Sequence, residues 1–200
     1  MRRRLVVIVL LVFIFTAQAI KVPGIIITND DDTLYVKLKI PVHANGDIYF
    51  LGLQYGTSYI DSKGEKQVFF STYAKEFQFL WEGDLIRMIS FKSTKEIGEV
   101  DAGYDKVFLH LKSNVRISHF YYYKSVMGQN PIRRKQNGQY FVDVFKRKDE
   151  PLFVLNRFEF KNKAMAYFSD CPSLVERIRN KTYRINDMTG LIWFYNYRCK

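Results

Sequence analysis

Apolar and polar residues alternate one for one over residues 33–40, with Leu34, Val36, Leu38 and Ile40 on one side of the segment. Side chains of a β-strand point alternately to its two faces, so this period of two predicts a strand with one buried face. Comparable segments recur along the chain, with turn-forming residues between them. The pattern predicts strands over residues 24–28, 33–40, 48–55, 67–71, 77–81, 85–91, 106–112, 115–124, 140–145 and 152–155, and a single helical turn over 73–76.

The hydrophobic period changes in the last part of the chain. A helix is expected over residues 186–199, where the apolar residues recur at helical spacing and share one face: Met188, Leu191, Ile192, Tyr195 and Cys199. A shorter helix is expected over residues 161–168. The chain therefore ends in helices after a long run of strands.

Asp170 and Pro172 mark the start of a further helix between these two. The Asp170 carboxylate is placed to cap free backbone N–H groups, and Pro172 falls in the first turn, where its missing N–H leaves nothing unsatisfied. The two cysteines of the chain, Cys171 and Cys199, lie at the start of this helix and at the end of the last one. In an antiparallel helix pair these points lie side by side, so we expect a disulfide. A catalytic or metal-binding role is the less favoured alternative, because the spacing is not C-x-x-C.

Strands followed by helices indicate an α+β fold. We expect an antiparallel sheet, curved or barrel-like, over residues 20–158. A C-terminal helical hairpin over residues 159–200 would then form a cap that packs on this sheet as part of one unit. No internal repeat or interdomain linker divides the sequence.

The first nineteen residues have the features of a secretory signal peptide. Arg2, Arg3 and Arg4 precede an apolar run over residues 5–15, and Ala17 and Ala19 are small residues suited to cleavage after position 19. An uncleaved anchor is the alternative, but the run is shorter than the ~20 apolar residues that span a bilayer. We therefore expect an exported protein, periplasmic or secreted, that does not span the membrane after cleavage.

The chain carries a formal net charge of +11. A basic balance is typical of proteins that bind nucleic acid, anionic lipid or acidic glycan, but it also serves solubility alone. For an exported protein the solubility interpretation is favoured, and we expect no nucleic-acid partner. Two loops concentrate the charge, and an anionic glycan or lipid would suit them if they shared one rim of the sheet: Arg133, Arg134, Lys135, Lys146, Arg147 and Lys148. The favoured interpretation is that these are solvated charges that discourage edge-to-edge aggregation.

Two of the three histidines lie close together in the sequence. His110 and His119 flank an expected two-residue turn at 113–114, which would set His110 opposite Ile117 and His119 opposite Phe108, with both rings on one face. Two histidines without a third ligand make a weak metal site, so strand histidines without a chemical role are favoured. Residues 30–32 are three aspartates, but they lack the spacing of a calcium loop and predict a hairpin turn. No catalytic residue, metal ligand set or cofactor follows from these patterns.

Residues 24–34 read GIIITNDDDTL, residues 120–123 read FYYY, and residues 170–174 read DCPSL. With these segments, most of the chain after residue 19 resembles a family of uncharacterised exported proteins of Bacteroidetes-type bacteria. Its members open with a G-x-I-V-T-x-x-G-D-T-I strand pair, which corresponds to residues 24–34 here, with Asp31 in place of the usual glycine. They end with D-C-P-x-L-x-x-x-I and a helix finishing in Y-N-x-C. These correspond to residues 170–178 and 195–199, with one additional residue before Cys199. The resemblance implies the same architecture and export, and it implies no activity or cofactor.

Three functions remain open from the sequence. The preferred one is a non-enzymatic binding or structural component of the cell envelope, which would present a basic or aromatic surface to an envelope partner. A secreted hydrolase of glycans or peptides would instead need a histidine beside a carboxylate, or paired carboxylates, in a cleft. An anionic glycan or lipid binder would use the basic loops.

Overall fold

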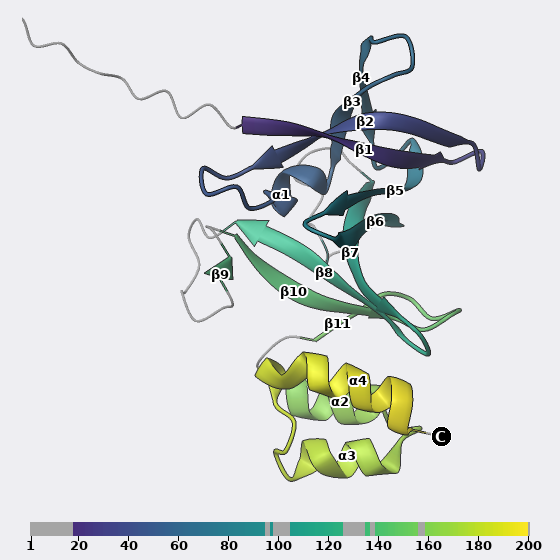
Figure 1. Cartoon of the computed structure of the whole chain (residues 1–200). Helices are drawn as coiled ribbons and strands as arrows, with labels where there is room; N and C mark the ends of the chain where they lie inside the picture. The colour runs from purple at the N-terminus through teal and green to yellow at the C-terminus, as the bar shows by residue number, and fades with distance from the viewer. Residues whose placement is uncertain are drawn as a thin grey trace, which may run out of the picture.

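The computed structural model describes residues 18–94, 97, 105–125, 135–136, 139–155 and 159–199, with only the backbone at 135 and 136. It is an α+β fold in which a large antiparallel sheet is followed by C-terminal helices (Figure 1). The strands are β1 (Gln18–Thr28), β2 (Thr33–Val42), β3 (Gly56–Ile60), β4 (Lys66–Phe70), β5 (Ala74–Trp81), β6 (Asp84–Lys92), β7 (Lys106–Asn114), β8 (Ser118–Ser125), β9 (Lys135–Gln136), β10 (Gln139–Lys146) and β11 (Phe153–Val154). The helices are α1 (Phe50–Leu53), α2 (Phe160–Tyr167), α3 (Pro172–Arg179) and α4 (Met188–Arg198), with the 3-10 turn η1 (Ile185–Asp187) before the last.

The sheet is open rather than closed into a barrel, which decides between the two shapes expected from the sequence. Its strands follow the order β11-β10-β8-β7-β6-β5-β1-β2-β3-β4, and β9 adds to the free edge of β10. Every neighbouring pair is antiparallel. β1 begins at Gln18, so the expected cleavage after Ala19 would shorten this strand by two residues.

The predicted hairpin at the start of the chain is confirmed. Residues 29–32 turn the chain between β1 and β2, with Asp31 at a positive φ of 67° and its carboxylate 2.6 Å from the ammonium group of Lys75. The alternation of β2 is confirmed from its middle onward, where Leu38 and Ile40 are fully buried. The aspartates therefore belong to a turn.

Two of the predicted secondary-structure segments are wrong, and β3 was not among the predicted strands. Residues 48–55 are not a strand: the described segment contains the short helix α1, which buries Phe50 and Leu53 one turn apart. Residues 73–76 are not a helical turn, because β5 begins at Ala74. Both faults have a tertiary cause, since β5 finds partners in β1 and β6 on its two sides, and α1 packs beside β2, β3 and β8.

The described residues form three apolar clusters. The largest is rich in aromatic side chains and lies against β1, β2, α1 and β4–β8, where Phe77, Phe108 and Phe69 meet edge to face. A second lies against the opposite side of β7, β8 and β10. The third joins the helices to Ile117, Phe145 and Leu155 of the sheet region, so the cap and the sheet share a core.

The cap contains three α-helices, α2 to α4, which lie together below the sheet in the view of Figure 1. The predicted face of α4 is confirmed, since Met188, Leu191, Ile192 and Tyr195 are buried. The predicted disulfide is also confirmed: Cys171 is bonded to Cys199, with 5.5 Å between their Cα atoms. It joins the start of α3 to the end of α4.

The expected role of Asp170 is wrong. The N-cap residue of α3 is Cys171, and no side chain caps this helix, although Pro172 does occupy its first turn. The Asp170 carboxylate accepts hydrogen bonds from Arg147 and Tyr195 instead. Asp170 therefore binds a guanidinium group and a phenol in place of the free N–H groups of α3.

Candidate functional site

The two strand histidines share a face of the sheet, but not in the expected register. β7 continues to Asn114 and β8 starts at Ser118, so the predicted turn at 113–114 is wrong. His110 pairs with Tyr121 rather than Ile117, and His119 pairs with Ser113 rather than Phe108. Because cross-strand partners point to the same side, His110, His119 and Tyr121 share one face.

The turn is displaced because its residues are fixed by the cap. The backbone N–H groups of Arg116 and Ile117 both donate to the side-chain oxygen of Asn196 in α4, at 3.2 and 3.1 Å. Ile117 is buried among the cap side chains. An irregularity in the pairing between Leu111 and Ser113 then takes up the difference. No local sequence pattern carries this information, because Asn196 lies about 80 residues away.

Among the described residues, His119 and Asp143 form the pair of side chains that most resembles part of a catalytic site. The Nε2 atom of His119 lies 2.8 Å from Oδ1 of Asp143 on β10, and its ring stacks on Phe145 at 5.1 Å. A histidine held by a carboxylate is the base-and-orienter unit of many hydrolases. The two side chains are only 5% and 10% exposed, however, so a substrate reaches them only if the surrounding side chains move.

His110 lies deeper in the same face. Its Nδ1 atom lies 2.9 Å from the hydroxyl of Tyr123, and its ring stacks on Phe50 of α1 at 4.5 Å. Burial lowers the pKa of His110 to about 3, with Lys112 and His119 acting in the same direction. His110 is therefore neutral at physiological pH and serves as a polar member of the aromatic core.

Gln54 explains how α1 is attached to this face. Its side-chain NH₂ group donates to the carbonyl of Tyr123 at 2.9 Å, and its side-chain oxygen accepts from the backbone N–H of the same residue. The side-chain amide of Gln54 thereby makes the two hydrogen bonds to Tyr123 that the backbone of a neighbouring strand would make. The sequence analysis missed this residue, since an isolated glutamine in an aromatic segment gives no signal of its own.

The described residues form no group of three or more histidine, cysteine, aspartate or glutamate side chains close enough to hold a metal ion. His119 and Asp143 thus provide two ligands at most. Their arrangement is suited to a buried structural pair.

The structure describes the side chains of three of the six basic loop residues, Lys146, Arg147 and Lys148. Arg133 and Arg134 lie outside the described residues, as does the side chain of Lys135. The backbone of Lys135 pairs with Tyr140 at the start of β10, whereas Lys146 ends that strand, about 20 Å away along it. Lys146 donates to the carbonyl groups of Arg147, Lys148 and Glu150 and so closes the β10–β11 loop.

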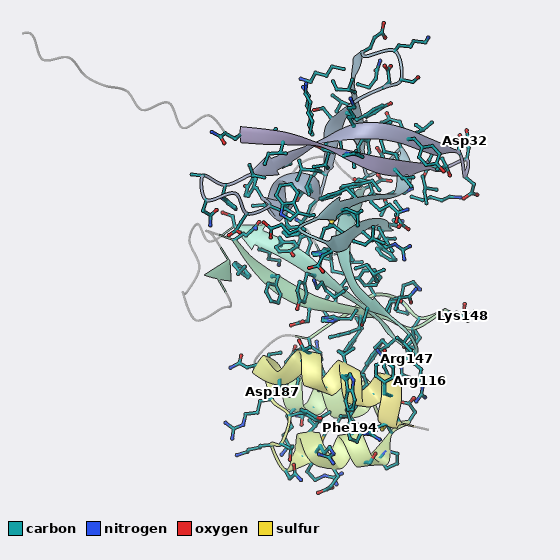
Figure 2. All side chains as sticks on the ribbon, in the orientation of Figure 1. Asp32, Arg116, Arg147, Lys148, Asp187 and Phe194 are labelled. Atoms are coloured by element: carbon teal, nitrogen blue, oxygen red, sulfur yellow. A yellow bond between two sulfur atoms is a disulfide. The ribbon has the colours of Figure 1, made fainter. Side chains whose placement is uncertain are left out.

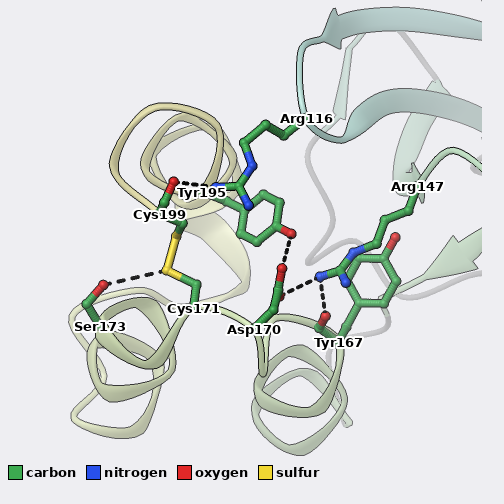
Figure 3. The surroundings of a disulfide bond; sticks show 8 residues. All are labelled: Arg116, Arg147, Tyr167, Asp170, Cys171, Ser173, Tyr195 and Cys199. Atoms are coloured by element: carbon green, nitrogen blue, oxygen red, sulfur yellow. Dashed lines mark hydrogen bonds and ion pairs between the residues drawn. A yellow bond between two sulfur atoms is a disulfide. The ribbon is translucent and has the colours of Figure 1, made fainter.

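Lys148 and Arg147 differ in their surroundings, although they are adjacent. Lys148 is exposed at the tip of the β10–β11 loop, while Arg147 of the same loop lies next to the cap, as Figure 2 shows. The Arg147 guanidinium donates to the carbonyl of Tyr167 at 2.6 Å and to the carboxylate of Asp170 at 2.8 Å (Figure 3). It also lies over the Tyr167 ring, 4.7 Å from its centre. Arg147 therefore links the sheet to the cap.

Asp170 is the centre of this junction. Its other oxygen accepts from the hydroxyl of Tyr195 at 2.5 Å. Burial alone would raise the pKa of Asp170, but the hydrogen bonds from Tyr195 and Arg147 hold it below its ordinary value. Burial and the bond to Asp170 raise the pKa of Tyr195 to about 12. The junction thus keeps a carboxylate, a phenol and a guanidinium in fixed protonation states at neutral pH.

The cap carries a second feature that the sequence analysis did not single out. Trp193 and Tyr197 lie one helical turn apart on the outward side of α4, 50% and 60% exposed, with ring centres 5.8 Å apart. Arg198 stacks over Trp193 at 5.3 Å, and Arg177 of α3 stacks over Phe194 at 4.7 Å. We call Trp193, Phe194, Tyr197, Arg177 and Arg198 the α4 aromatic face. The i, i+4 spacing of Trp193 and Tyr197 was the feature of the sequence that could have predicted this face.

Fold and site together define a class: an α+β protein with an open antiparallel sheet, a disulfide-stapled helical cap and exposed aromatic and basic groups. Comparison of the chain with protein-family models, curated proteins and solved structures finds no match. The resemblance to the exported Bacteroidetes-type family stays a prediction. Within the part of the chain that the structure describes, no helix has the length and apolar character needed to span a bilayer.

Proposed function

We propose that the protein is an exported, non-enzymatic binding component of the cell envelope and that the α4 aromatic face docks its partner. The observation that carries this proposal is that α4 is apolar on both sides. Its inner side is buried in the cap, and its outer side presents Trp193 and Tyr197. A helix that is apolar all round is typically covered on every side, so the outer side is expected to be covered by another molecule.

The chemistry of the face favours a protein partner with an acidic rim. Tryptophan, tyrosine and arginine are the residues most enriched among those that dominate binding energy in protein interfaces. Here all three types are adjacent, and both guanidinium groups already lie against rings. A partner that adds carboxylates would neutralise Arg177 and Arg198 while its apolar side chains cover the rings.

The disulfide supports both export and docking. A disulfide persists in an oxidising compartment, in agreement with the predicted signal peptide over residues 1–19. It also fixes the end of α4 one residue beyond Arg198, where the carbonyl of Cys199 accepts a hydrogen bond from Arg116. A face held in this way loses little conformational entropy on binding.

The test starts with photo-crosslinking from position 197 in the living cell, which identifies the partner. The purified pair is then measured by calorimetry with the wild type, Trp193→Ala and Tyr73→Ala. Tyr73 is the matched control because it is 68% exposed and lies outside the cap. We expect Trp193→Ala to weaken binding about thirtyfold and Tyr73→Ala to leave it unchanged. Equal affinities for all three would refute docking on this face.

A hydrolase remains the second candidate, favoured by the contact between His119 and Asp143. It requires that a substrate displace the side chains that cover the pair. Wild type, His119→Gln and Asp143→Asn are compared for release of sugars or peptides from envelope polymers. Turnover by the wild type that is lost in both variants would support this function, and a rate independent of both residues would exclude it for this pair.

A further inference from the structure

A second exposed surface lies on the outer side of β1 and β2. The register sets Lys21 directly opposite Lys39 and sets Lys37 opposite Pro23, one step further along the same face. Lys66 of β4 joins the row, because it pairs with Ile60, which in turn pairs with Lys37. We call Lys21, Lys37, Lys39 and Lys66 the lysine face.

The lysine face carries uncompensated charge. None of its four ammonium groups forms an ion pair or a side-chain hydrogen bond among the described residues. Glu76, which the register sets on the same side of the sheet, is already held by both ends of the Arg87 fork, at 2.6 and 2.9 Å. Like charges directly opposite one another destabilise a sheet, so the pairing of Lys21 with Lys39 opposes folding. An anion bound between them would remove that repulsion.

Tyr35 extends the row along β2. It is two residues from Lys37 on the same face and is 76% exposed, the largest exposure of any large apolar side chain that the structure describes. Tyr35, Lys37 and Lys39 therefore form a row of about 13 Å along β2. An aromatic ring followed by two cations, with a third beside them, matches a linear chain that carries both ring-shaped and anionic units.

We propose that the lysine face, together with Tyr35, binds an acidic polysaccharide: the Tyr35 ring stacks on one sugar while Lys21, Lys37 and Lys39 bind carboxylate or sulfate groups of the same chain. A flat anionic membrane fits this surface less well. The turn between β5 and β6 carries Glu82, which is exposed and would repel lipid headgroups that approached the whole face.

This surface is separate from the α4 aromatic face. β1 and β2 lie at the end of the molecule opposite to the cap (Figure 1). The protein would then bridge an acidic polymer and a protein partner. A substitution on one face could remove one interaction and leave the other intact.

The experiment measures affinity for polygalacturonate, a carboxylated probe, and heparin, a sulfated one, at fixed salt. The variant Lys21→Gln/Lys37→Gln/Lys39→Gln is compared with Arg133→Gln/Arg134→Gln/Lys135→Gln, which removes the same charge from the loop. We expect the first to bind about tenfold or more weakly and the second to match the wild type. Loss confined to the loop variant would overturn the assignment. A melting temperature equal to or above that of the wild type shows that the sheet variant is folded.

The variant Tyr35→Ala distinguishes stacking on a sugar ring from general electrostatic attraction to a polyanion. We expect it to weaken binding to polygalacturonate severalfold and to leave binding to inorganic polyphosphate unchanged. Equal binding of wild type and Tyr35→Ala to both polymers would overturn the polysaccharide as ligand. So would tight, lysine-dependent binding to phosphatidylglycerol vesicles without binding to either polysaccharide.

Discussion

The sheet and the cap are stabilised in different ways. The sheet buries a continuous aromatic core in which Phe69, Phe77 and Phe108 contact one another, and its polar members, such as Gln54 and His110, are enclosed. The cap is small, and much of its order comes from the disulfide, from Asn196 and from the cations that lie over Tyr167 and Tyr195. The cap also buries an apolar cluster that it shares with Ile117, Phe145 and Leu155 of the sheet region, and the covalent and charged contacts add to that burial.

The two tryptophans of the chain make this comparison measurable. Trp81 lies in the sheet and Trp193 lies in the cap. In Trp193→Phe the remaining fluorescence reports the sheet, and in Trp81→Phe it reports the cap. Coincident urea transitions would show that residues 20–158 and 159–200 unfold as the single unit predicted from the sequence, and separate transitions would show two.

The largest effect is expected for Phe108→Ala. Phe108 is fully buried, with ring centres 4.9 Å from Phe77 and 6.0 Å from Phe69. The variant should lose about 4 kcal/mol of unfolding free energy, because a cavity remains where the ring was. Urea titration followed at Trp81 measures it. A loss below about 1 kcal/mol would contradict the view that this aromatic cluster dominates the sheet.

Removal of the disulfide is expected to act on the cap with a slightly smaller effect. Cys171→Ser/Cys199→Ser opens a ring that spans 28 positions, for which loop entropy predicts a loss of about 3.5 kcal/mol. Hydrogen exchange measures where the loss falls. Amides of α3 and α4 should lose protection before those of β1, β2 and β5, and a uniform loss would contradict a separate role for the cap.

Acidification is expected to weaken the sheet through His110. Its folded-state pKa of about 3 lies below the ordinary value of 6.5, so the unfolded chain binds a proton that the folded chain excludes. The contribution is complete above pH 6.5 and declines as the pH falls towards 3. Between pH 7 and pH 4.5 the wild type should lose about 3 kcal/mol more than His110→Gln. Parallel pH profiles of the two proteins would show that His110 is protonated without penalty.

The smallest effect concerns the contact between the regions. Asn196→Leu keeps the shape of the side chain but leaves the backbone N–H groups of Arg116 and Ile117 without an acceptor, for an expected loss of about 2 kcal/mol. Asn196→Asp retains the acceptor and is the control. Chemical denaturation of both, followed at Trp193, tests the contact. Equal stability of the Leu and Asp variants would show that water satisfies these groups.

Prediction from the sequence succeeded for segments that bury the same side as their own hydrophobic pattern indicates. The hairpin at residues 29–32, the alternation in β2 and the helical face of α4 follow from spacing alone, because each element buries the side that its own residues specify. The pairing of Cys171 with Cys199 followed from two cysteines at matching ends of two helices. The error at residues 48–55 has the opposite origin: aromatic side chains suit a strand and a buried helical turn equally.

The candidate sites were harder to predict, because each depends on contacts between distant segments. The histidines were identified as sharing a face, but His119 meets Asp143 through the pairing of β8 with β10. Lys21 and Lys39 become neighbours only through the register of β1 and β2. Arg147 stood out as a loop cation, yet its partner Asp170 lies in the cap.

The sequence by itself determined the class of fold, the passage from strands to C-terminal helices, the disulfide and the predicted export signal, because these depend on composition and on hydrophobic period within short segments. Only the tertiary structure decided that the sheet stays open, that the turn between β7 and β8 falls after Asn114, and which charges are compensated. Those properties depend on register and on contacts such as that of Asn196 with Ile117, which join residues far apart in the chain.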